Sequence, residues 1–372
     1  ICKDVGLNVI LAVPQNLPSP RWLMEMYPDS WVVNHRGEKG HLRWPYACFN
    51  HPGLRERSAS FIKEYVTHFR DHPNLIMYQL DNEICYSPED RLVEKLAFHC
   101  YCQNCLKAFN RWLDSRYEGR ERPESKRHTC GVLSRELLPL SDMRPISPPD
   151  PVFCPELLWV EWRRFHDHVI TTKMKWIADE VKKYDKIHPV TSNLMIGAWA
   201  MLRNHDIFDL SRQLDYVGTS SYTDVTKDYE IGDSMNLTIA RSNAKGKGWH
   251  VLERKGVPLK SLSHDIFDAN GIKKTGDRRR VITWSWRPLS YGARSLIYWV
   301  WRLQRPNDYS IARPDGTLAT EFLPAIEKLS AGFKKVYPYI AEAKPLPSDV
   351  AVFFSKASIH LASKSGDFNI LE

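Results

Sequence analysis

Two glutamates follow short apolar segments, in surroundings that are typical of catalytic carboxylates. Glu83 stands directly behind Asn82, after the apolar run Leu75–Leu80. Glu253 follows the apolar residues Trp249–Leu252 in the same way. A glutamate at the end of a buried strand can act as a general acid when burial raises its pKa, and a neighbouring Asn can hold a substrate hydroxyl. The two glutamates together predict hydrolysis of a glycosidic bond with retention, which needs two carboxylates about 5–5.5 Å apart.

Each glutamate also has a structural interpretation. Asp81 or Asn82 can cap the start of a following helix, which makes that segment an ordinary turn. Glu253 can form a surface ion pair with Arg254 or Lys255. By their place along the chain, however, the two glutamates belong to the fourth and seventh strands of a barrel, at the face where barrel enzymes keep their active sites. This pairing favours the catalytic interpretation of both residues.

A dense group of cysteines predicts a bound metal ion. The run Cys100–Cys105 has the spacing C-x-C-x-x-C, so its three thiolates can share one tetrahedral ion. Cys48 is the candidate for the fourth ligand, with Cys85 and His99 as alternatives. Four protein ligands leave no position for a reactive water, so the expected ion is a structural zinc. Unrelated buried thiols are the competing interpretation, which this close spacing disfavours.

Short apolar segments that alternate with longer helical patterns must position these residues. Helices are predicted over 54–70 and 157–184, and strands over 7–13, 75–80, 189–193, 214–218, 249–252 and 295–300. This alternation is typical of a parallel sheet. We expect an α/β fold, a (β/α)8 TIM barrel that lacks its first two β/α units. A doubly wound open sheet is the alternative, but no Gly-rich phosphate turn follows any strand.

The chain is expected to hold one large domain and the beginning of another. The catalytic barrel is predicted over residues 1–344, with a zinc-binding insertion near 85–117 and an irregular, Pro- and Arg-rich insertion over 118–151. From residue 345 to 372 the pattern changes to that of a second α/β domain, with a first strand over 349–354.

Both ends of the sequence are interpreted as truncated. The first residue is Ile1, and residues 1–6 read as the last turn of a helix with Gly6 as its C-terminal cap. A barrel that begins inside its second helix explains this start. The predicted second domain breaks off at Glu372.

The composition narrows the class of protein. The 372 residues carry a net charge of +8, with basic residues scattered along the chain, which disfavours nucleic-acid binding. A zinc-ribbon module that binds nucleic acid would need a second Cys cluster. No apolar run approaches the roughly 18 residues of a membrane span. The 13 Trp and 16 Tyr residues supply rings of the kind that stack on sugar faces.

Several motifs together resemble one family, the family-42 glycoside hydrolases, which are β-galactosidases of the large retaining barrel clan. The motifs are Tyr46-Ala47-Cys48-Phe49, Asp81-Asn82-Glu83, the cysteines at 100, 102 and 105, and Phe109-x-x-Trp112-Leu113-x-x-Arg116-Tyr117. Weaker matches are Pro18-x-Pro20-x-Trp22-Leu23, Val190-Thr191-x-Asn193 and Trp301-Arg302. The likeness covers most of the chain.

The resemblance implies a role for each of these residues. Glu83 is implied to be the acid/base, Asn82 to bind the sugar 2-hydroxyl, and Glu253 to be the nucleophile. Substrate-binding residues are implied at Arg43, Asn193, Tyr222 and Trp301. A structural Zn²⁺ is implied at Cys48, Cys100, Cys102 and Cys105. The substrate is expected to be a β-galactoside oligosaccharide, with no nucleic-acid or membrane partner, in a cytoplasmic protein that forms homotrimers at full length.

Departures from the family's pattern leave two alternatives open. The loop after Glu253 has no Trp before Trp284, and residues 305–309 offer no clear equivalent of the family's galactose-reading Glu and His. Sugar choice depends on such hydroxyl contacts, so specificity for galactose is less secure than glycosidase activity. The alternatives are a β-glycosidase for another sugar, such as an arabinoside or fucoside, and a catalytically inactive carbohydrate-binding barrel.

Overall fold

A computed structural model of the chain describes twelve stretches, and the following paragraphs concern these residues alone. They are 2–14, 19–39, 47–85, 99–118, 156–222, 229–255, 278–302, 312, 315–318, 323–341, 343 and 348–365. The chain divides into two compact units. The first comprises Ile1–Val190, Ala198–Leu214 and Phe353–Glu372, and the second comprises Thr191–Gly197 and Asp215–Val352.

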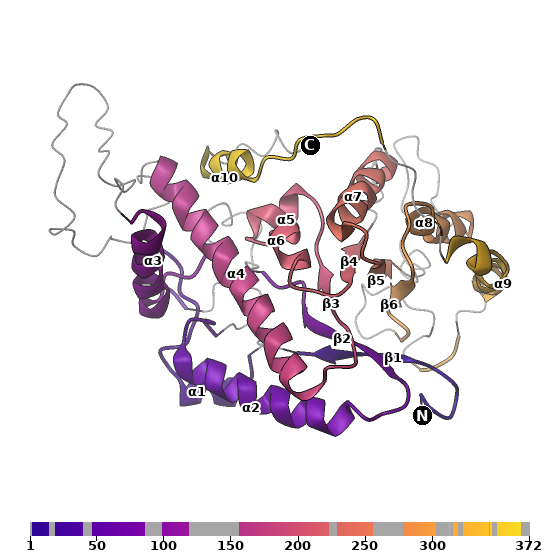
Figure 1. The fold of residues 1–372 in the computed structure, drawn as a ribbon, viewed down its shortest axis with the longest axis horizontal. Helices are drawn as coiled ribbons and strands as arrows, with labels where there is room; N and C mark the ends of the chain where they lie inside the picture. The colour runs from indigo at the N-terminus through magenta and orange to yellow at the C-terminus, as the bar shows by residue number, and fades with distance from the viewer. Residues whose placement is uncertain are drawn as a thin grey trace, which may run out of the picture. The chain divides into compact units, whose positions relative to one another are not determined.

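The first unit contains a pair of parallel strands and the helix that connects them. Strand β1 (Val9–Val13) pairs with β2 (Leu75–Asn82), and α2 (Pro52–Phe69) lies between them in the chain (Figure 1). Helix α2 begins with a proline at its first position, where a missing N–H costs nothing. The His51 ring caps it by accepting from the Leu54 N–H at 3.2 Å. The predicted strands and helix are therefore confirmed here, with shifts of one or two residues at their ends.

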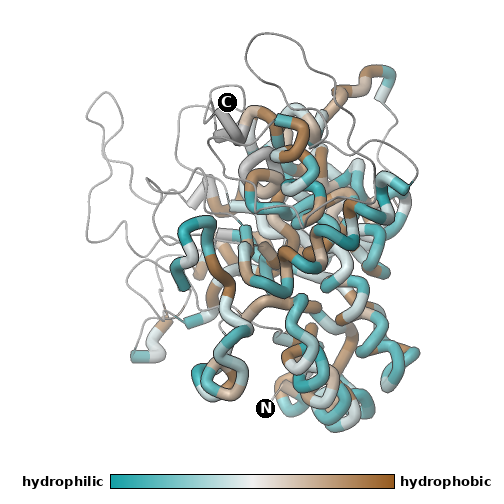
Figure 2. The backbone as a smooth tube through the Cα atoms, turned by 90° about the vertical axis from the view of Figure 1, so that its left-hand side faces the viewer, coloured by the Kyte–Doolittle hydropathy of each residue, from teal (hydrophilic) through white to brown (hydrophobic). Residues whose placement is uncertain are grey.

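Three further helices belong to this unit: α1 (Arg21–Met26), α3 (Gln103–Arg116) and α4 (Glu156–Tyr184). Aromatic side chains hold α3 against α4. The rings of Phe109 and Trp162 meet edge to face, with their centroids 4.8 Å apart, and both side chains are almost fully buried. Along the backbone, hydrophobic and hydrophilic stretches alternate, as expected for helices that bury one face (Figure 2).

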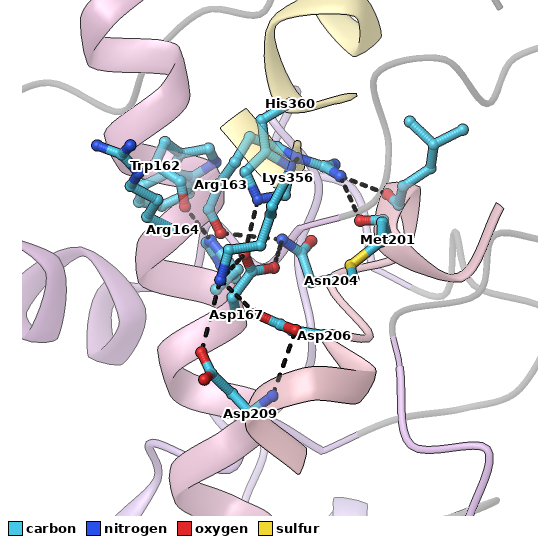
Figure 3. A network of polar contacts seen from close by, with 12 residues as sticks. Trp162, Arg163, Arg164, Asp167, Met201, Asn204, Asp206, Asp209, Lys356 and His360 are labelled. Carbon is cyan, nitrogen blue, oxygen red and sulfur yellow. Dashed lines mark hydrogen bonds and ion pairs between the residues drawn. The ribbon is translucent and has the colours of Figure 1, made fainter. Parts of the chain in front are cut away.

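The C-terminal helix α10 (Lys356–Ser365) is tied to α4 by a buried network of charges (Figure 3). The His360 ring lies 2.6 Å from the Asp167 carboxylate, and the Lys356 ammonium reaches both Asp167 and Asp206. Arg163, fully buried, donates to the backbone carbonyl of Met201 at 3.0 Å. Burial alone would raise the pKa of Asp167, but the neighbouring cations bring it below its ordinary value. The network therefore fixes α10 to the first unit.

Two short helices supply the rest of this network. They are α5 (Ala198–Leu202) and α6 (Ile207–Ser211). Asp206 caps α6 by accepting from the N–H groups of Phe208 and Asp209. Asn204, between the two helices, donates to the Asp167 carboxylate at 2.9 Å.

The second unit is a run of parallel strands in chain order. Strands β3 (Val190–Leu194), β4 (Val217–Ser221), β5 (Trp249–Lys255) and β6 (Leu296–Trp299) pair each with the next. Helices α7 (Tyr229–Ala244), α8 (Arg278–Ser290) and α9 (Leu323–Ile340) alternate with or follow them. Strands that follow chain order without reversal are typical of a barrel wall, whereas a doubly wound sheet reverses its order at a switch point.

Close backbone approach explains one glycine in this sheet. A Cβ built on Gly218 in β4 would lie 2.5 Å from the Ser192 carbonyl oxygen and 2.4 Å from the Leu252 side chain. Neither neighbour leaves room for a larger residue, so the strands approach closely only because position 218 is glycine.

Near the two ends of the described chain, one prediction from the sequence agrees with the structure and one does not. Gly6 has φ of +69°, and the Gly6 and Leu7 N–H groups bond to the carbonyls of Lys3 and Cys2, which is the capping pattern of a helix C-terminus. The strand predicted over 349–354 is wrong, since this segment has no strand and its apolar side chains, such as Phe353 at 90% exposure, lack a ladder partner among the described residues.

Two other expectations fall outside this description or are not tested by it. The irregular insertion over 118–151 lies, apart from its first residue, outside the described residues. The division at residue 345 stays a prediction. Within the described part of the chain, no helix combines the length and the apolar character that crossing a bilayer requires.

Candidate active site

The turn that follows β2 carries Asn82 and Glu83, and its backbone is strained. Asp81 and Glu83 both have positive φ, +53° and +44°, a region that costs a non-glycine residue about 1–3 kcal/mol. Asn82 is exposed and Glu83 half-buried, so both side chains are accessible at the carboxyl end of the strand. Strain of this kind persists only where surrounding contacts enforce it, and functional sites are where it usually occurs.

A buried ion pair enforces the turn from one side. The Lys173 ammonium, on α4, lies 2.7 Å from the Asp81 carboxylate, and the side chains are 8% and 0% exposed. The other Asp81 oxygen accepts from the Asn82 N–H at 3.0 Å. Removing either charge would leave its partner buried and uncompensated, at a cost of about 3–5 kcal/mol. The pair thus holds the residues next to Glu83 in place.

A buried histidine holds the other side of the same turn. The His205 ring nitrogen Nδ1 lies 2.7 Å from the Ile84 carbonyl oxygen, and the side chain is fully buried. Burial lowers the pKa of His205 to about 4, from an ordinary value of 6.5. The ring is therefore neutral at pH 7, and Nδ1 carries the proton that it donates to Ile84.

Acid should destabilise the protein through this histidine. The unfolded chain binds a proton near pH 6.5, whereas His205 in the folded protein binds it only near pH 4. Stability is then fully present above about pH 6.5 and is lost as the pH falls toward 4, by at most about 3 kcal/mol. Urea unfolding of wild type and His205→Asn between pH 7.5 and 4.5 measures this, with exposed His68→Asn as control. A pH slope unchanged in His205→Asn would contradict the prediction.

The second glutamate lies on β5, directly after a bulge. Thr219 of β4 pairs with Val251, but Ser220 pairs with Glu253, so Leu252 is an extra residue in β5. A bulge bends its strand and re-aims the side chains that follow, and it often lies next to an active site. Glu253 is half-buried, and its direction is set by this irregularity.

Tyr222 is the hydrogen-bond partner of Glu253. The tyrosine hydroxyl donates to Oε2 of Glu253 at 2.6 Å, and Tyr222 follows the last residue of β4. A hydroxyl that donates to a carboxylate stabilises its ionised form and fixes its orientation. An ionised, oriented carboxylate is what a nucleophile at this position requires.

The remaining substrate-binding candidates have different environments. Asn193 is fully buried in β3, where its Oδ1 accepts from the Ser220 hydroxyl at 2.9 Å. Trp301 follows β6 and is 65% exposed, as a ring that stacks on a sugar would be. Arg43 lies outside the described residues.

The predicted site residues are divided between the two units of the chain. Asn82 and Glu83 belong to the first unit, whereas Asn193, Tyr222, Glu253 and Trp301 belong to the second. Contacts within the second unit bring Tyr222 to Glu253. The pairing of Glu83 with Glu253 across one bond stays a prediction.

The four predicted metal-binding cysteines do converge. The sulfur atoms of Cys48, Cys100, Cys102 and Cys105 all lie within 4.8 Å of one another, and all four side chains are buried. Cys48 and Cys105 are 3.3 Å apart. Tetrahedral zinc with bonds of about 2.3 Å places its sulfurs roughly 3.8 Å apart, so this group has the right size. Cys48 is the fourth member, and neither Cys85 nor His99 belongs to the group.

One thiol of this cluster ionises far more readily than two of its neighbours: the pKa values of Cys48 and Cys105 are raised, chiefly by their hydrogen bonds with Cys100 and Cys102. Hydrogen bonds from the other three thiols, led by Cys100, lower the pKa of Cys102 far below its ordinary value. Cys102 is also the N-cap residue of α3, where the helix dipole favours negative charge. The Asn50 side chain donates to the Cys105 sulfur at 3.2 Å, as the outer partners of metal ligands do. The donor set therefore fits zinc.

Sequence reasoning missed the buried polar and charged residues that support the two glutamates: Lys173, His205, Asp233 and Arg254. A signal existed for two of them. Lys173 lies on the apolar stripe of α4, between the buried Ile170 and Ile177. Asp233 precedes the buried Leu237 by one helical turn. A charge on a buried helix face requires a buried partner, and this requirement could have marked both residues.

Comparison with known proteins decides the family. The family-42 glycoside hydrolase model, described as beta-galactosidase, matches residues 1–310. The chain belongs to glycoside hydrolase family 42. Among curated relatives, beta-galactosidase YesZ of Bacillus licheniformis is 25% identical over 376 residues, an alignment that covers 97% of this chain and 51% of YesZ. Beta-galactosidase BgaH of Haloferax lucentense is 24% identical, over 80% of this chain and 43% of BgaH. This family-42 chain thus spans about half the length of these relatives.

Solved structures of family-42 enzymes share the fold. A beta-galactosidase from the haloarchaeon Halorubrum lacusprofundi superposes with a TM-score of 0.76 at 20% identity, covering 98% of this chain and 53% of that one. The beta-galactosidase of Bacillus circulans sp. alkalophilus gives a TM-score of 0.74 at 19% identity, covering 97% and 51%. The expected α/β barrel architecture of a family-42 protein is therefore confirmed.

Proposed function

We propose that the protein hydrolyses terminal, non-reducing β-D-galactose residues of β-galactosides with retention of configuration. The observation that carries the proposal is the bond from Tyr222 to Glu253 at the carboxyl end of the sheet, in a chain of family 42. An ionised carboxylate oriented in this way is suited to attack an anomeric carbon. The curated relatives YesZ and BgaH are named beta-galactosidases, which supports galactose as the sugar.

The reaction takes two steps. Glu253 attacks the anomeric carbon and forms a glycosyl ester, while Glu83 gives its proton to the glycosidic oxygen and the aglycone leaves. In the second step, Glu83 takes a proton from water, the water oxygen bonds to the anomeric carbon, and the ester bond to Glu253 breaks. The two inversions at carbon give net retention. Tyr222 keeps the Glu253 carboxylate in the attacking orientation.

Other residues would hold the sugar. Asn82, exposed beside Glu83, is assigned to the sugar 2-hydroxyl, whose hydrogen bond strengthens in the transition state. Trp301 is assigned to the stacking surface, and Arg43 and Asn193 to hydroxyl contacts. Asn193 is buried, so its contact requires a path to the sugar beside Ser220.

We also propose that Cys48, Cys100, Cys102 and Cys105 hold a structural zinc ion. Its support is the spacing and burial of the four sulfurs and the hydrogen bond from Asn50 to Cys105. Zinc bound by four thiolates has no open position, so it would stabilise the loop before α3 and take no part in the reaction.

Hydrolysis of a panel of nitrophenyl glycosides by the full chain tests the function. The β-galactoside should be hydrolysed at least about tenfold faster than the β-glucoside, β-fucoside and α-arabinoside, because a site that hydrogen-bonds the hydroxyls of galactose leaves polar groups unpaired with an analogue that lacks or displaces one of them. A higher rate on another glycoside would show that its sugar, and not galactose, is the preferred substrate. No turnover on any glycoside by a folded, zinc-loaded preparation would overturn the assignment as an enzyme.

A further inference from the structure

A fully buried arginine lies directly behind the proposed nucleophile. Arg254 follows Glu253 on β5, and its side chain is 0% exposed. A buried guanidinium is costly unless its charge is paired and its donors are satisfied. Arg254 offsets most of this cost with an ion pair to the Asp233 carboxylate of α7, in which Nη1 and Nη2 lie 2.8 and 3.0 Å from the two oxygens. Its Nε has no hydrogen-bond partner among the described residues. Such two-pronged pairs fix geometry as well as charge.

Other hydrogen bonds of Arg254 reach the strand that carries Tyr222. Nη1 donates to the carbonyl oxygen of Ser221 at 3.2 Å and to its hydroxyl at 2.5 Å. Ser221 is the last residue of β4 and immediately precedes Tyr222. Nη2 also donates to the Trp284 carbonyl of α8 at 3.0 Å. One guanidinium therefore joins the ends of β4 and β5 to the helices behind them.

The bulge makes this connection necessary. Leu252 is an extra residue in β5, so the regular ladder does not by itself set the position of Glu253 opposite β4. The next paired residues are Ser221 and Arg254, which the guanidinium also joins. The strand ends that present Tyr222 and Glu253 are thus fixed by a side chain at the point where the backbone pairing is irregular.

We infer that Arg254, held by Asp233, is a positioning residue that places Tyr222 against Glu253. Arg254 acts through these two residues and does not itself touch the sugar. The inference rests on the proposed function for its kinetic consequences, although the contact that it explains is independent of any substrate.

The sharpest test is Arg254→Lys, which keeps the charge and loses the planar fork. We expect kcat on the nitrophenyl β-galactoside to fall about 10- to 100-fold with KM changed less than about threefold, because a misplacement of about 1 Å near the reacting atoms has effects of this size. In a Tyr222→Phe background, the same substitution should lower kcat less than about threefold, since the tyrosine hydroxyl that Arg254 positions is already absent. A full, additive effect in that background would overturn the inference.

Two further variants separate positioning from folding. Arg254→Met combined with Asp233→Leu replaces the ion pair by apolar side chains, a change that proteins often tolerate in stability. Arg287, which lies 3.5 Å from Asp233, also loses this partner but keeps 16% of its side chain exposed to water. This double variant should fold and still lose kcat. Glu161→Gln is the control. Glu161, on α4 in the first unit, is a fully buried carboxylate paired with Arg116 of α3 and Arg164 of α4. This control variant should lower the melting temperature and leave kcat unchanged. A double variant with wild-type kcat would overturn the inference.

A structural measurement distinguishes this inference from the proposed function. Crystals of wild type and Arg254→Lys should differ in the separation of Tyr222 Oη and Glu253 Oε2, which is 2.6 Å in the wild type and is expected to exceed about 3.5 Å in the variant. Wild type inactive on every glycoside would overturn the function alone, and this separation would then decide the inference. An unchanged separation in the variant would overturn the inference, whatever the activity.

Discussion

Glu253→Gly should lower kcat/KM for the nitrophenyl β-galactoside by more than about 10³-fold, and added azide should restore turnover. Removing the nucleophile eliminates the covalent step, and losses for an essential nucleophile reach this size or more. Azide fits the space left by the carboxylate and attacks the same carbon, so the product should be the α-galactosyl azide, with inverted configuration. Product configuration is measured by NMR of the anomeric proton.

Two companion variants control this experiment. Glu253→Gln is nearly isosteric and should be as inactive as the glycine variant, but without azide rescue, because its side chain still fills the space. Asp209→Asn, a half-exposed carboxylate of α6 in the first unit, should retain wild-type turnover. If Glu253→Gly kept more than a tenth of the wild-type rate, another residue would be the nucleophile.

Removal of zinc should lower the free energy of unfolding of the protein by as much as any single substitution does. Metal sites of this kind contribute binding free energy directly to folding, on the order of 10 kcal/mol in small zinc domains. We expect wild type to contain about one zinc per chain by mass spectrometry, and a chelator to lower the melting temperature by about 10 °C or more. Cys102→Ala should contain no zinc and melt at the lowered temperature without chelator.

Cys85→Ala is the matched control for this variant. Cys85 is buried like the cluster cysteines, but it lies outside the cluster, and burial raises the pKa of its thiol to about 12. This variant should retain zinc and respond to the chelator as wild type does. Zinc lost equally from Cys85→Ala and Cys102→Ala would contradict the assignment of the four ligands.

Local patterns predict the elements of this protein well. The strands from β1 to β6 each begin within about three residues of a strand predicted from the sequence, because short segments that start with apolar residues and alternate with helical patterns are typical of a parallel sheet. The apolar pattern of α4 likewise predicts its whole length, from Glu156 to Tyr184. The strand predicted over 349–354 is absent because an apolar run forms a strand only where another strand pairs with it.

The candidate site is predictable only in part, for a physical reason. Cys48 joins the cluster at 100–105 across more than fifty residues, so spacing leaves Cys85 and His99 as alternatives, and the family resemblance supports the choice of Cys48. The residues that support the turn of Glu83 come from farther away still. Lys173 approaches Asp81 from a helix ninety-two residues later in the chain, and such contacts leave no local periodicity. A charge on an apolar face indicates that a partner exists, but only the fold identifies it.

The attachment of α10 limits how the chain can be shortened for laboratory use. A version that stops before Lys356 would remove His360 and Lys356 together, so Asp167 would lose two of the cations that lie beside it and keep Arg163 and Asn204. The Asp167 carboxylate would then lack the cations that chiefly hold its pKa below the ordinary value. Expression of such a version should yield aggregated protein, whereas a boundary placed after Ser365 keeps the helix and its charges.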